Sequence, residues 1–222
     1  MRRYIVVVAL SALLWSLCLP VYGAGTPVKR TLVIDAGHGG EDGGAVSADG
    51  VLESDINLKI ALRMETLAHF CGVPTRMTRS SGEIDYPPEL TKTAQRKVYD
   101  QKKRVELICE TPNAVLISVH QNKYPDPRPR GPQVLYGSGE ESKCFGELAH
   151  ELLTTAVYPE NRRVAAPISK DIYLMRMVDC PAILAECGFL SNREEAALLG
   201  TDACQTRIAC ALLCAYLQYF QA

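Results

Sequence analysis

Residues 31–40, TLVIDAGHGG, decide how this chain folds, because an apolar, β-branched run ends there in a glycine-rich loop that carries a histidine. The run does not alternate between apolar and polar side chains. Continuous apolar runs of this length are typical of strands that are covered on both faces of a parallel sheet. Two further runs share this form, AVLISVH at 114–120 and AILAE at 182–186. The sequence therefore predicts a central parallel sheet.

Helical patterns separate the apolar runs, which is the alternation that builds an α/β fold. We expect one domain with a mainly parallel open sheet of about six strands and helices on both faces. The predicted strands are 31–35, 73–78, 114–120, 133–136, 172–175 and 182–186. The predicted helices are 55–70, 92–109, 141–157, 204–220 and a short one near 193–199. Ser54 or Asp55 is expected to cap the first helix.

Four side chains that can carry chemistry stand at the ends of these elements. His38 and His120 follow two of the strands, and Glu186 closes a third. Glu53 opens the first helix. Active sites of open parallel sheets form beyond the carboxyl ends of the strands, so these residues can converge.

Two imidazoles and one carboxylate, from His38, His120 and Glu53, make the ligand set of a catalytic zinc site with one position open for water. Such an ion lowers the pKa of its water and polarises a carbonyl, which suits amide hydrolysis. Glu186 is the candidate for proton transfer, because a carboxylate that closes an apolar strand needs a partner or a catalytic role.

Each residue has a plainer interpretation when it is considered alone. A single histidine after a strand is more often hydrogen-bonded for structural reasons than bound to a metal. Glu53 alone is a helix-start charge favoured by the helix dipole, and Glu186 alone is a member of a buried ion pair. His69 and His150 lie in helical patterns and are expected to be surface or packing residues. The spacing of the four residues is weakly specific by itself, unlike a compact H-E-x-x-H motif.

Five ordered motifs add to this interpretation: IDAGHGG at 34–40, Glu53 followed by NL at 57–58, MTR at 77–79, SVHQN at 118–122 and ECGFLSN at 186–192. Together they resemble the zinc-dependent N-acetylmuramoyl-L-alanine amidases of the Amidase_3 family. The resemblance covers roughly residues 31–220, so a zinc amidase domain is expected at 27–222. It implies one Zn²⁺ on His38, Glu53 and His120, with Glu186 as the catalytic carboxylate. It also implies hydrolysis of the amide bond between N-acetylmuramic acid and L-alanine in peptidoglycan.

Details of the motifs are similar to the spore-cortex, CwlD-type branch of that family. They include HQN at 120–122, GPQV at 131–134 and NRR at 161–163. This likeness implies a role in cortex maturation, where stem peptides are removed so that a downstream deacetylase can form muramic δ-lactam. It also implies an activating partner protein. The alternatives are a general vegetative cell-wall amidase and a non-catalytic peptidoglycan-binding protein of the same fold.

The composition is ordinary: 222 residues, 47% hydrophobic, 22% charged and a formal net charge of −1. No basic stripe predicts a nucleic-acid partner. A phosphate cradle in the glycine-rich loop is disfavoured, because the loop lacks the P-loop lysine and because Glu41 and Asp42 would repel phosphate.

The first 24 residues differ from the rest of the chain. Arg2 and Arg3 precede an apolar run and a small-residue region, which is typical of an export signal. An uncleaved membrane anchor is the alternative, so membrane contact is expected only through this segment. The protein is expected to act outside the cytoplasm, in the cell wall or the forespore intermembrane space.

Nine cysteines are present, and export permits disulfides. We nevertheless expect thiols, because Cys204, Cys210 and Cys214 lie in an apolar helical pattern where free cysteine packs as a small hydrophobe.

Several flanking residues complete the predicted site. The proline-rich loop at 124–132 follows a strand end and is expected to overhang the site. Arg162 and Arg163 are candidates for contacts with substrate carboxylates. Asn122 and Asp35 are candidates for orienting ligands, since metal ligands usually have hydrogen-bonding partners of their own.

Overall fold

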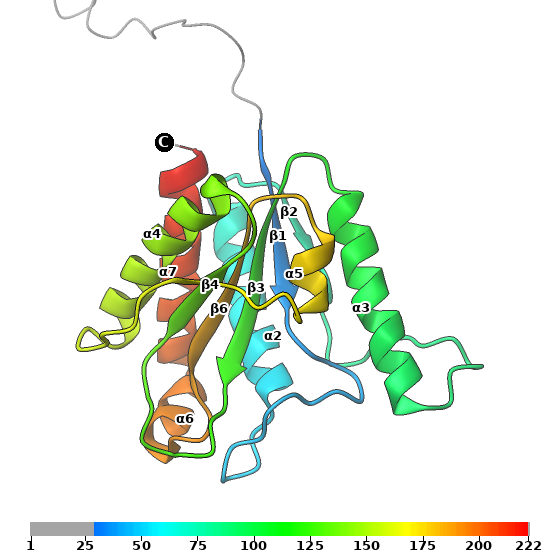
Figure 1. Ribbon diagram of the computed structural model, residues 1–222, viewed down its shortest axis with the longest axis horizontal. Helices are drawn as coiled ribbons and strands as arrows, with labels where there is room; N and C mark the ends of the chain where they lie inside the picture. The colour runs from blue at the N-terminus through cyan, green and yellow to red at the C-terminus, as the bar shows by residue number, and fades with distance from the viewer. Residues whose placement is uncertain (1–28, 222) are drawn as a thin grey trace, which may run out of the picture.

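A six-stranded sheet forms the centre of the molecule, and the computed structural model describes it within residues 29–221 (Figure 1). The strands are β1 (Thr31–Ala36), β2 (Thr75–Met77), β3 (Ala114–Asn122), β4 (Gln133–Tyr136), β5 (Ala166–Pro167) and β6 (Ala182–Phe189). They lie in the order β2-β1-β3-β6-β4-β5. Only the β4–β6 pair is antiparallel. The predicted mainly parallel open sheet is confirmed.

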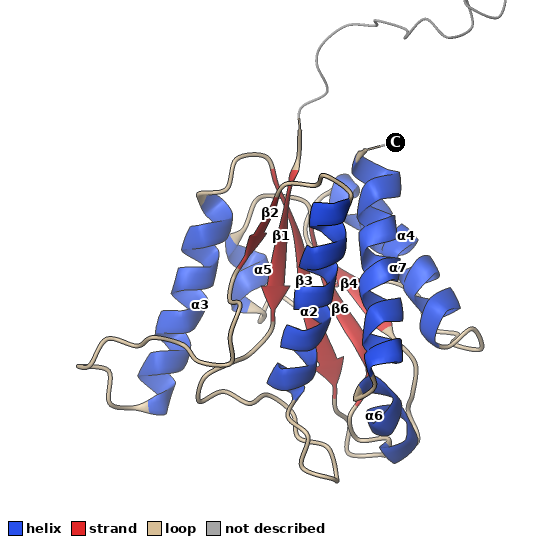
Figure 2. Cartoon of the chain, turned by 180° about the vertical axis from the view of Figure 1, so that it is seen from behind, coloured by secondary structure: helices blue, strands red, loops and turns tan. Residues whose placement is uncertain are grey.

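Helices cover both faces of this sheet, as predicted. Within the described chain they are α2 (Glu53–Phe70), α3 (Thr93–Cys109), α4 (Glu140–Val157), α5 (Tyr173–Met177), α6 (Arg193–Leu199) and α7 (Asp202–Phe220). Helices α2, α4 and α7 pack on one face, while α3 and α5 lie on the other (Figures 1 and 2).

The three apolar strands are central because both of their faces are covered. In β1, Leu32 and Ile34 join the core under α2 and α7, whereas Val33 joins the core under α3 and α5. All three side chains are fully buried. This two-sided burial explains why the run at 31–35 shows no alternation of apolar and polar residues.

The predicted strand at 172–175 is wrong, because residues 173–175 lie in the helix α5 and Ile172 is its N-cap. A short apolar run fits a strand or a buried helical turn equally well. Leu174 and Met175 are buried against the sheet from this helix. The sixth strand is instead β5, a two-residue edge strand on β4 that is too short to leave a pattern.

The predicted cap of the first helix is also wrong. Helix α2 starts at Glu53, and its N-cap residue Leu52 makes no side-chain capping bond. The Glu53 and Ser54 backbone N–H groups donate instead to the carbonyls of Ala45 and Gly43 (2.8 and 3.1 Å). The preceding loop therefore satisfies the helix start, and a capping side chain is not needed.

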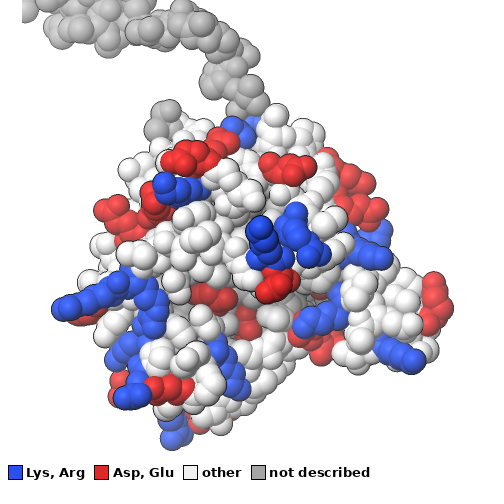
Figure 3. Space-filling model, in the orientation of Figure 1, with Lys and Arg blue, Asp and Glu red and all other residues white. Residues whose placement is uncertain are grey.

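Two expectations concern the surface and the ends of the chain. On the face shown in Figure 3, basic and acidic side chains are interspersed and form no continuous basic stripe. None of the helices in residues 29–221 combines the length and apolar character needed to cross a bilayer. The proposed signal or anchor at 1–24 lies outside the described residues.

Candidate metal centre

The carboxyl ends of three neighbouring strands bring the four predicted residues to one cavity of about 520 Å³. His38 follows β1, and His120 lies near the end of β3. Glu186 in β6 is the register partner of His120 across the parallel pair. Glu53 reaches the same cavity from the first turn of α2. The parallel topology therefore assembles side chains that are far apart in the sequence.

Three donor atoms in this cavity are spaced as the ligands of a single metal ion. Glu53 Oε1 lies 3.0 Å from His120 Nδ1 and 3.3 Å from His38 Nε2. One ligand atom from each of the three residues lies within 4.8 Å of the other two. Tetrahedral zinc ligands at ~2.1 Å from the ion are about 3.4 Å apart. The donor types and their spacing both fit a metal with an open position.

Two glycines let the chain wrap tightly around these ligands. A Cβ atom on Gly37 would lie 2.3 Å from His120 Nε2. A Cβ atom on Gly44 would lie 2.6 Å from Glu53 Oε2, and Gly44 also has a φ of +69°. His38 itself adopts a left-handed φ of 60°. The loop conformation is therefore demanding and needs support from its surroundings.

Two buried arginines supply that support by binding three consecutive carbonyls. Arg104 donates to the Ala36 and His38 carbonyls (2.7 and 2.6 Å). Arg79 donates to the Ala36 and Gly37 carbonyls (2.9 and 3.1 Å). These bonds fix the backbone that presents the His38 ring.

The charge of Arg104 is balanced by Asp35, which is equally buried, at 2.7 Å. Asp35 also accepts hydrogen bonds from Ser118 and Thr78 (2.5 and 2.7 Å). Burial alone raises the pKa of Asp35, but Arg104 and the two hydroxyl donors outweigh it and hold the pKa below its usual range. Asp35 was expected to orient a histidine. It binds Arg104, Ser118 and Thr78 instead.

Sequence reasoning missed Asp42 as a partner of His38. Asp42 Oδ2 lies 3.0 Å from His38 Nδ1 and 2.9 Å from the Lys97 ammonium. Burial raises the pKa of Asp42, but Lys97 and His38 lower it by more than burial raises it. The net pKa lies below the ordinary value, so the group is a carboxylate. With Nδ1 directed at Asp42, Nε2 is the ring nitrogen of His38 that faces Glu53 and is placed to bind a metal ion. The i, i+4 spacing from His38 was the only signal for this role.

The two glutamates of the site have opposite protonation tendencies. Burial opposes ionisation of Glu53, but the His120 and His38 rings hold its pKa well below the usual range. Burial raises the pKa of Glu186 to about 7; the two rings lower it and the Glu53 charge raises it. Among the described residues, Glu186 Oε2 is buried without a hydrogen-bond partner. An unpartnered carboxylate beside three converging donors is a candidate for proton transfer.

A family model described as N-acetylmuramoyl-L-alanine amidase (Amidase_3) matches residues 32–215. The chain belongs to this amidase family. The germination-specific N-acetylmuramoyl-L-alanine amidase of Bacillus subtilis (strain 168) is 36% identical over 208 residues, which cover 93% of this chain and 83% of that protein. AmiA of Escherichia coli (strain K12) is 25% identical over 235 residues, covering 86% and 76%. The protein is therefore an N-acetylmuramoyl-L-alanine amidase, and its substrate is peptidoglycan.

Solved structures show the same fold. The CwlD amidase from Clostridioides difficile, determined in complex with the GerS lipoprotein, is 34% identical with a TM-score of 0.83, covering 86% of this chain and 98% of that one. The catalytic domain of CwlV from Bacillus(Paenibacillus) polymyxa var. colistinus is 27% identical with a TM-score of 0.73 and the same coverage. These likenesses agree with the CwlD-type branch that the motifs predicted.

The flanking residues of the amidase site differ from expectation. The loop at 124–132 does not line the described cavity; residues 171–174 line it instead. The loop contacts the start of α6, where the side chain of Asn192 donates to the Pro127 carbonyl (2.9 Å). Asn122 lines the cavity, and its role in orienting a ligand stays a prediction. The expectation that the proline-rich loop overhangs the site is wrong.

The two candidate arginines lie outside this cavity. Arg163 donates to the Arg130 and Gly131 carbonyls and stacks 4.7 Å from the centre of the Phe189 ring. It therefore stabilises the loop that enters β4. Arg162 lines a separate pocket beside Arg130.

The remaining histidines and the cysteines have structural surroundings. His69 is exposed and bonds to Thr75, whereas His150 is buried and accepts from the Val134 N–H. The eight cysteines of the described chain are free thiols.

Proposed function

We propose that this amidase uses one zinc ion, held by His38, Glu53 and His120, to hydrolyse the bond between N-acetylmuramic acid and L-alanine. Glu186 is the proposed catalytic residue. The observation that carries the proposal is the buried, unpartnered Oε2 atom of Glu186 beside three donor atoms within 4.8 Å of one another. A structural carboxylate in such a place would have a partner.

Each residue has a defined task in this reaction. The chemistry that zinc supplies in such a site is activation of a water molecule and polarisation of the substrate carbonyl. Glu186 accepts a proton from the attacking water and delivers one to the departing alanine nitrogen as the C–N bond breaks. Asp42 holds the proton on His38 Nδ1, so that Nε2 faces the donor cluster. Arg79 and Arg104 keep the loop that carries His38 in its left-handed conformation.

The proposed setting is spore-cortex maturation. Its support is the likeness to a germination-specific amidase and to a CwlD amidase solved with a lipoprotein. By analogy, we propose an activating partner protein, and a downstream deacetylase that forms muramic δ-lactam. Residues 1–24 are proposed to be an export signal or anchor and 27–222 the catalytic domain, which places the reaction outside the cytoplasm.

The enzymatic proposal is tested with purified full-length protein, zinc and isolated peptidoglycan. Wild type is expected to release stem peptides with a free L-alanine amino group. His38→Ala is expected to lose both zinc and activity. Glu186→Gln is expected to keep zinc and lose activity. Full activity of Glu186→Gln contradicts the mechanism, and sedimentation with sacculi without product supports the non-catalytic alternative.

The biological setting is tested separately with spores of a deletion strain. Loss of muramic δ-lactam from their muropeptide profile is the expected result. An unchanged profile favours the alternative of a general vegetative cell-wall amidase.

A further inference from the structure

We infer that Asn57 is a positioning residue that fixes the three metal ligands relative to one another. Asn57 is fully buried in α2, one turn after Glu53. Its side chain is inaccessible to substrate, so it can act only through the residues it contacts. The inference rests on the proposed function, because it concerns the geometry of the proposed metal site.

The side-chain amide of Asn57 bonds at or beside every ligand. Its Nδ2 group donates to Glu53 Oε1 (3.3 Å). The same group donates to the carbonyl of Gly37, the residue before His38 (3.1 Å). Its Oδ1 atom accepts from Nε2 of Gln121, the residue after His120 (3.1 Å). One side chain thus connects α2, the end of β1 and the end of β3.

An amide is the side chain that this position requires. It offers two N–H donors and one carbonyl acceptor, and here each finds a partner. A carboxylate has no donors when ionised and would face the Glu53 carboxylate. Leucine has a similar volume but would leave the buried Gln121 Nε2 group without its acceptor, and the Gly37 carbonyl with only Arg79 as a donor. The Asn57 amide thus bonds to two acceptors and one donor that lie on three different elements. A residue that only filled space would not need these bonds.

Gln121 makes this network more rigid. Its side chain is buried, and its backbone N–H also donates to Glu53 Oε1 (3.0 Å). Glu53 is therefore held from its own helix by Asn57 and from β3 by Gln121. Outer partners of metal ligands typically change metal affinity by about 10–100-fold when they are removed. The Asn57 network should affect zinc affinity to a similar degree.

The test compares zinc affinity in the full chain for wild type, Asn57→Leu and Gln205→Leu. Gln205 is the matched control, because it is another fully buried amide, on α7, that donates to the Leu199 carbonyl (2.9 Å) outside the cavity. Zinc dissociation constants come from competition with a chromophoric chelator, and circular dichroism confirms that each variant is folded. The visible spectrum of bound Co²⁺ reports the coordination geometry independently of activity.

We expect both leucine variants to unfold at lower temperature in the metal-free form. Only Asn57→Leu should bind zinc about 10–100-fold more weakly and shift the Co²⁺ spectrum. Zinc affinity of Asn57→Leu within twofold of wild type, with an unchanged Co²⁺ spectrum, would overturn the inference. A purely structural role predicts that result.

A second variant covers the case in which Asn57→Leu does not fold. Gln121→Ala removes the side-chain bond to Asn57 and keeps the backbone bond to Glu53, so its zinc affinity should fall in the same direction by a smaller factor. An affinity within twofold of wild type then overturns the inference. If wild type itself binds no zinc, the proposed metal site is wrong and this inference falls with it; equal zinc binding by wild type and the Asn57 variant refutes the inference alone.

Discussion

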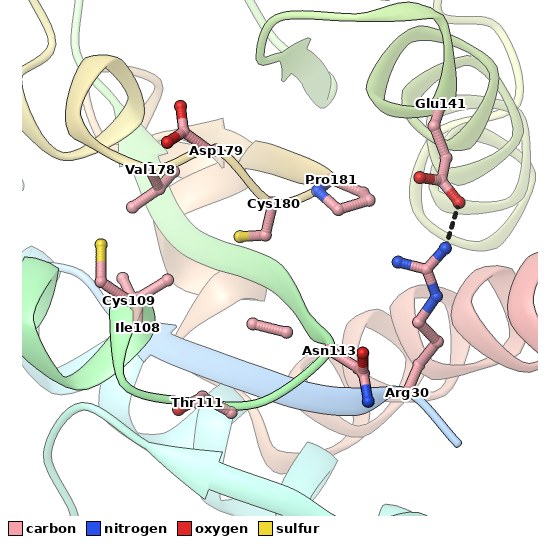
Figure 4. A pocket seen from close by; sticks show the side chains of 11 residues that line it. Arg30, Ile108, Cys109, Thr111, Asn113, Glu141, Val178, Asp179, Cys180 and Pro181 are labelled. Carbon is pink, nitrogen blue, oxygen red and sulfur yellow. Dashed lines mark hydrogen bonds and ion pairs between the residues drawn. The ribbon is translucent and has the colours of Figure 1, made fainter. Parts of the chain in front are cut away.

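The sheet has a cavity at each end, and the two are similar in size but not in content. The cavity beyond the carboxyl ends of the strands measures about 520 Å³, and the one at their amino ends about 440 Å³. The first contains His38, Glu53, His120 and Glu186. The second contains Cys109 and Cys180 beside an ion pair between Arg30 and Glu141 (2.8 Å), as Figure 4 shows.

The difference teaches that the chemistry of the lining groups, and not the volume of the cavity, distinguishes the candidate site. At the amino end, Arg30 and Glu141 are partly exposed and satisfy each other. Burial raises the pKa of the Cys180 thiol to about 11, so it stays protonated and unreactive. At the carboxyl end, Glu186 is buried without a partner, and three donor atoms face one point. Loops at that end are long enough to present side chains, as in other open parallel sheets.

The largest effect should come from exchanging one ligand at the carboxyl end for alanine. His120→Ala removes one of three donors, so we expect metal binding and peptidoglycan hydrolysis to fall to background. Removing proton transfer alone, as in Glu186→Gln, should lower kcat by about 10²–10⁴-fold. Cys180→Ala, at the amino end, is the matched control and should retain wild-type zinc content and kcat/KM. Equal losses from His120→Ala and Cys180→Ala would contradict the contrast between the two cavities.

The next effect concerns the buried ion pair under the His38 loop. Asp35→Asn removes the buried carboxylate beside Arg104 and leaves Asp100 as its remaining carboxylate partner, so we expect unfolding free energy at pH 7 to fall by about 3 kcal/mol, the lower end of the cost of breaking a buried pair. The folded pKa of Asp35 is below its ordinary value of 3.8. As pH falls below 3.8, Asp35 is protonated in the unfolded state before it is protonated in the folded state. The stability that the Asp35 carboxylate contributes is therefore lost as pH falls through the folded pKa. Urea unfolding should therefore show a full gap between wild type and variant at pH 7 and a narrowing gap toward pH 3.

A gap that stays constant between pH 7 and pH 3 would contradict the role of the Asp35 carboxylate charge. Ser118→Ala serves as the control, because it removes one donor to Asp35 while keeping the ion pair.

Glu186 should show the opposite pH dependence in the metal-free protein. Its folded pKa of about 7 exceeds the ordinary 4.5, so the unfolded state ionises first as pH rises. Stability is therefore lost between pH 4.5 and 7, by about 3 kcal/mol at ~1.4 kcal/mol per pKa unit. Metal-free Glu186→Gln should be more stable than metal-free wild type at pH 8, and the two should be similar at pH 4. Denaturant unfolding in chelator measures both; a wild type that is as stable as the variant at pH 8 would refute the desolvation of Glu186.

The smallest effect should come from the ion pair at the amino end. Arg30→Ala breaks a pair whose side chains are 31% and 44% exposed. Exposed pairs contribute about 0–1 kcal/mol, and salt screens them. We expect a change within about 1 kcal/mol that shrinks in 1 M salt, and unchanged kcat/KM. A larger loss of unfolding free energy that does not depend on salt would contradict the contrast between the two ends of the sheet.

Much of the fold and the candidate ligand set could be predicted from the sequence, because those features have local signatures. Two-sided burial gives the central strands their continuous apolar runs, and the strand ends identify His38, His120 and Glu186. Helix α5 and strand β5 were missed because short segments have no distinctive period. Their structure depends on what they pack against.

The sequence by itself determined the chemical groups of the site and the end of the sheet at which they stand. Tertiary structure alone decided how those groups are held. Arg104 reaches Asp35 across 69 positions, and Gln121 reaches Asn57 across 64. Such partners share no spacing rule, because a parallel sheet joins its strands through helices and loops of variable length. A buried polar group needs a partner in space, and that partner's position in the chain is set only when the sheet has formed.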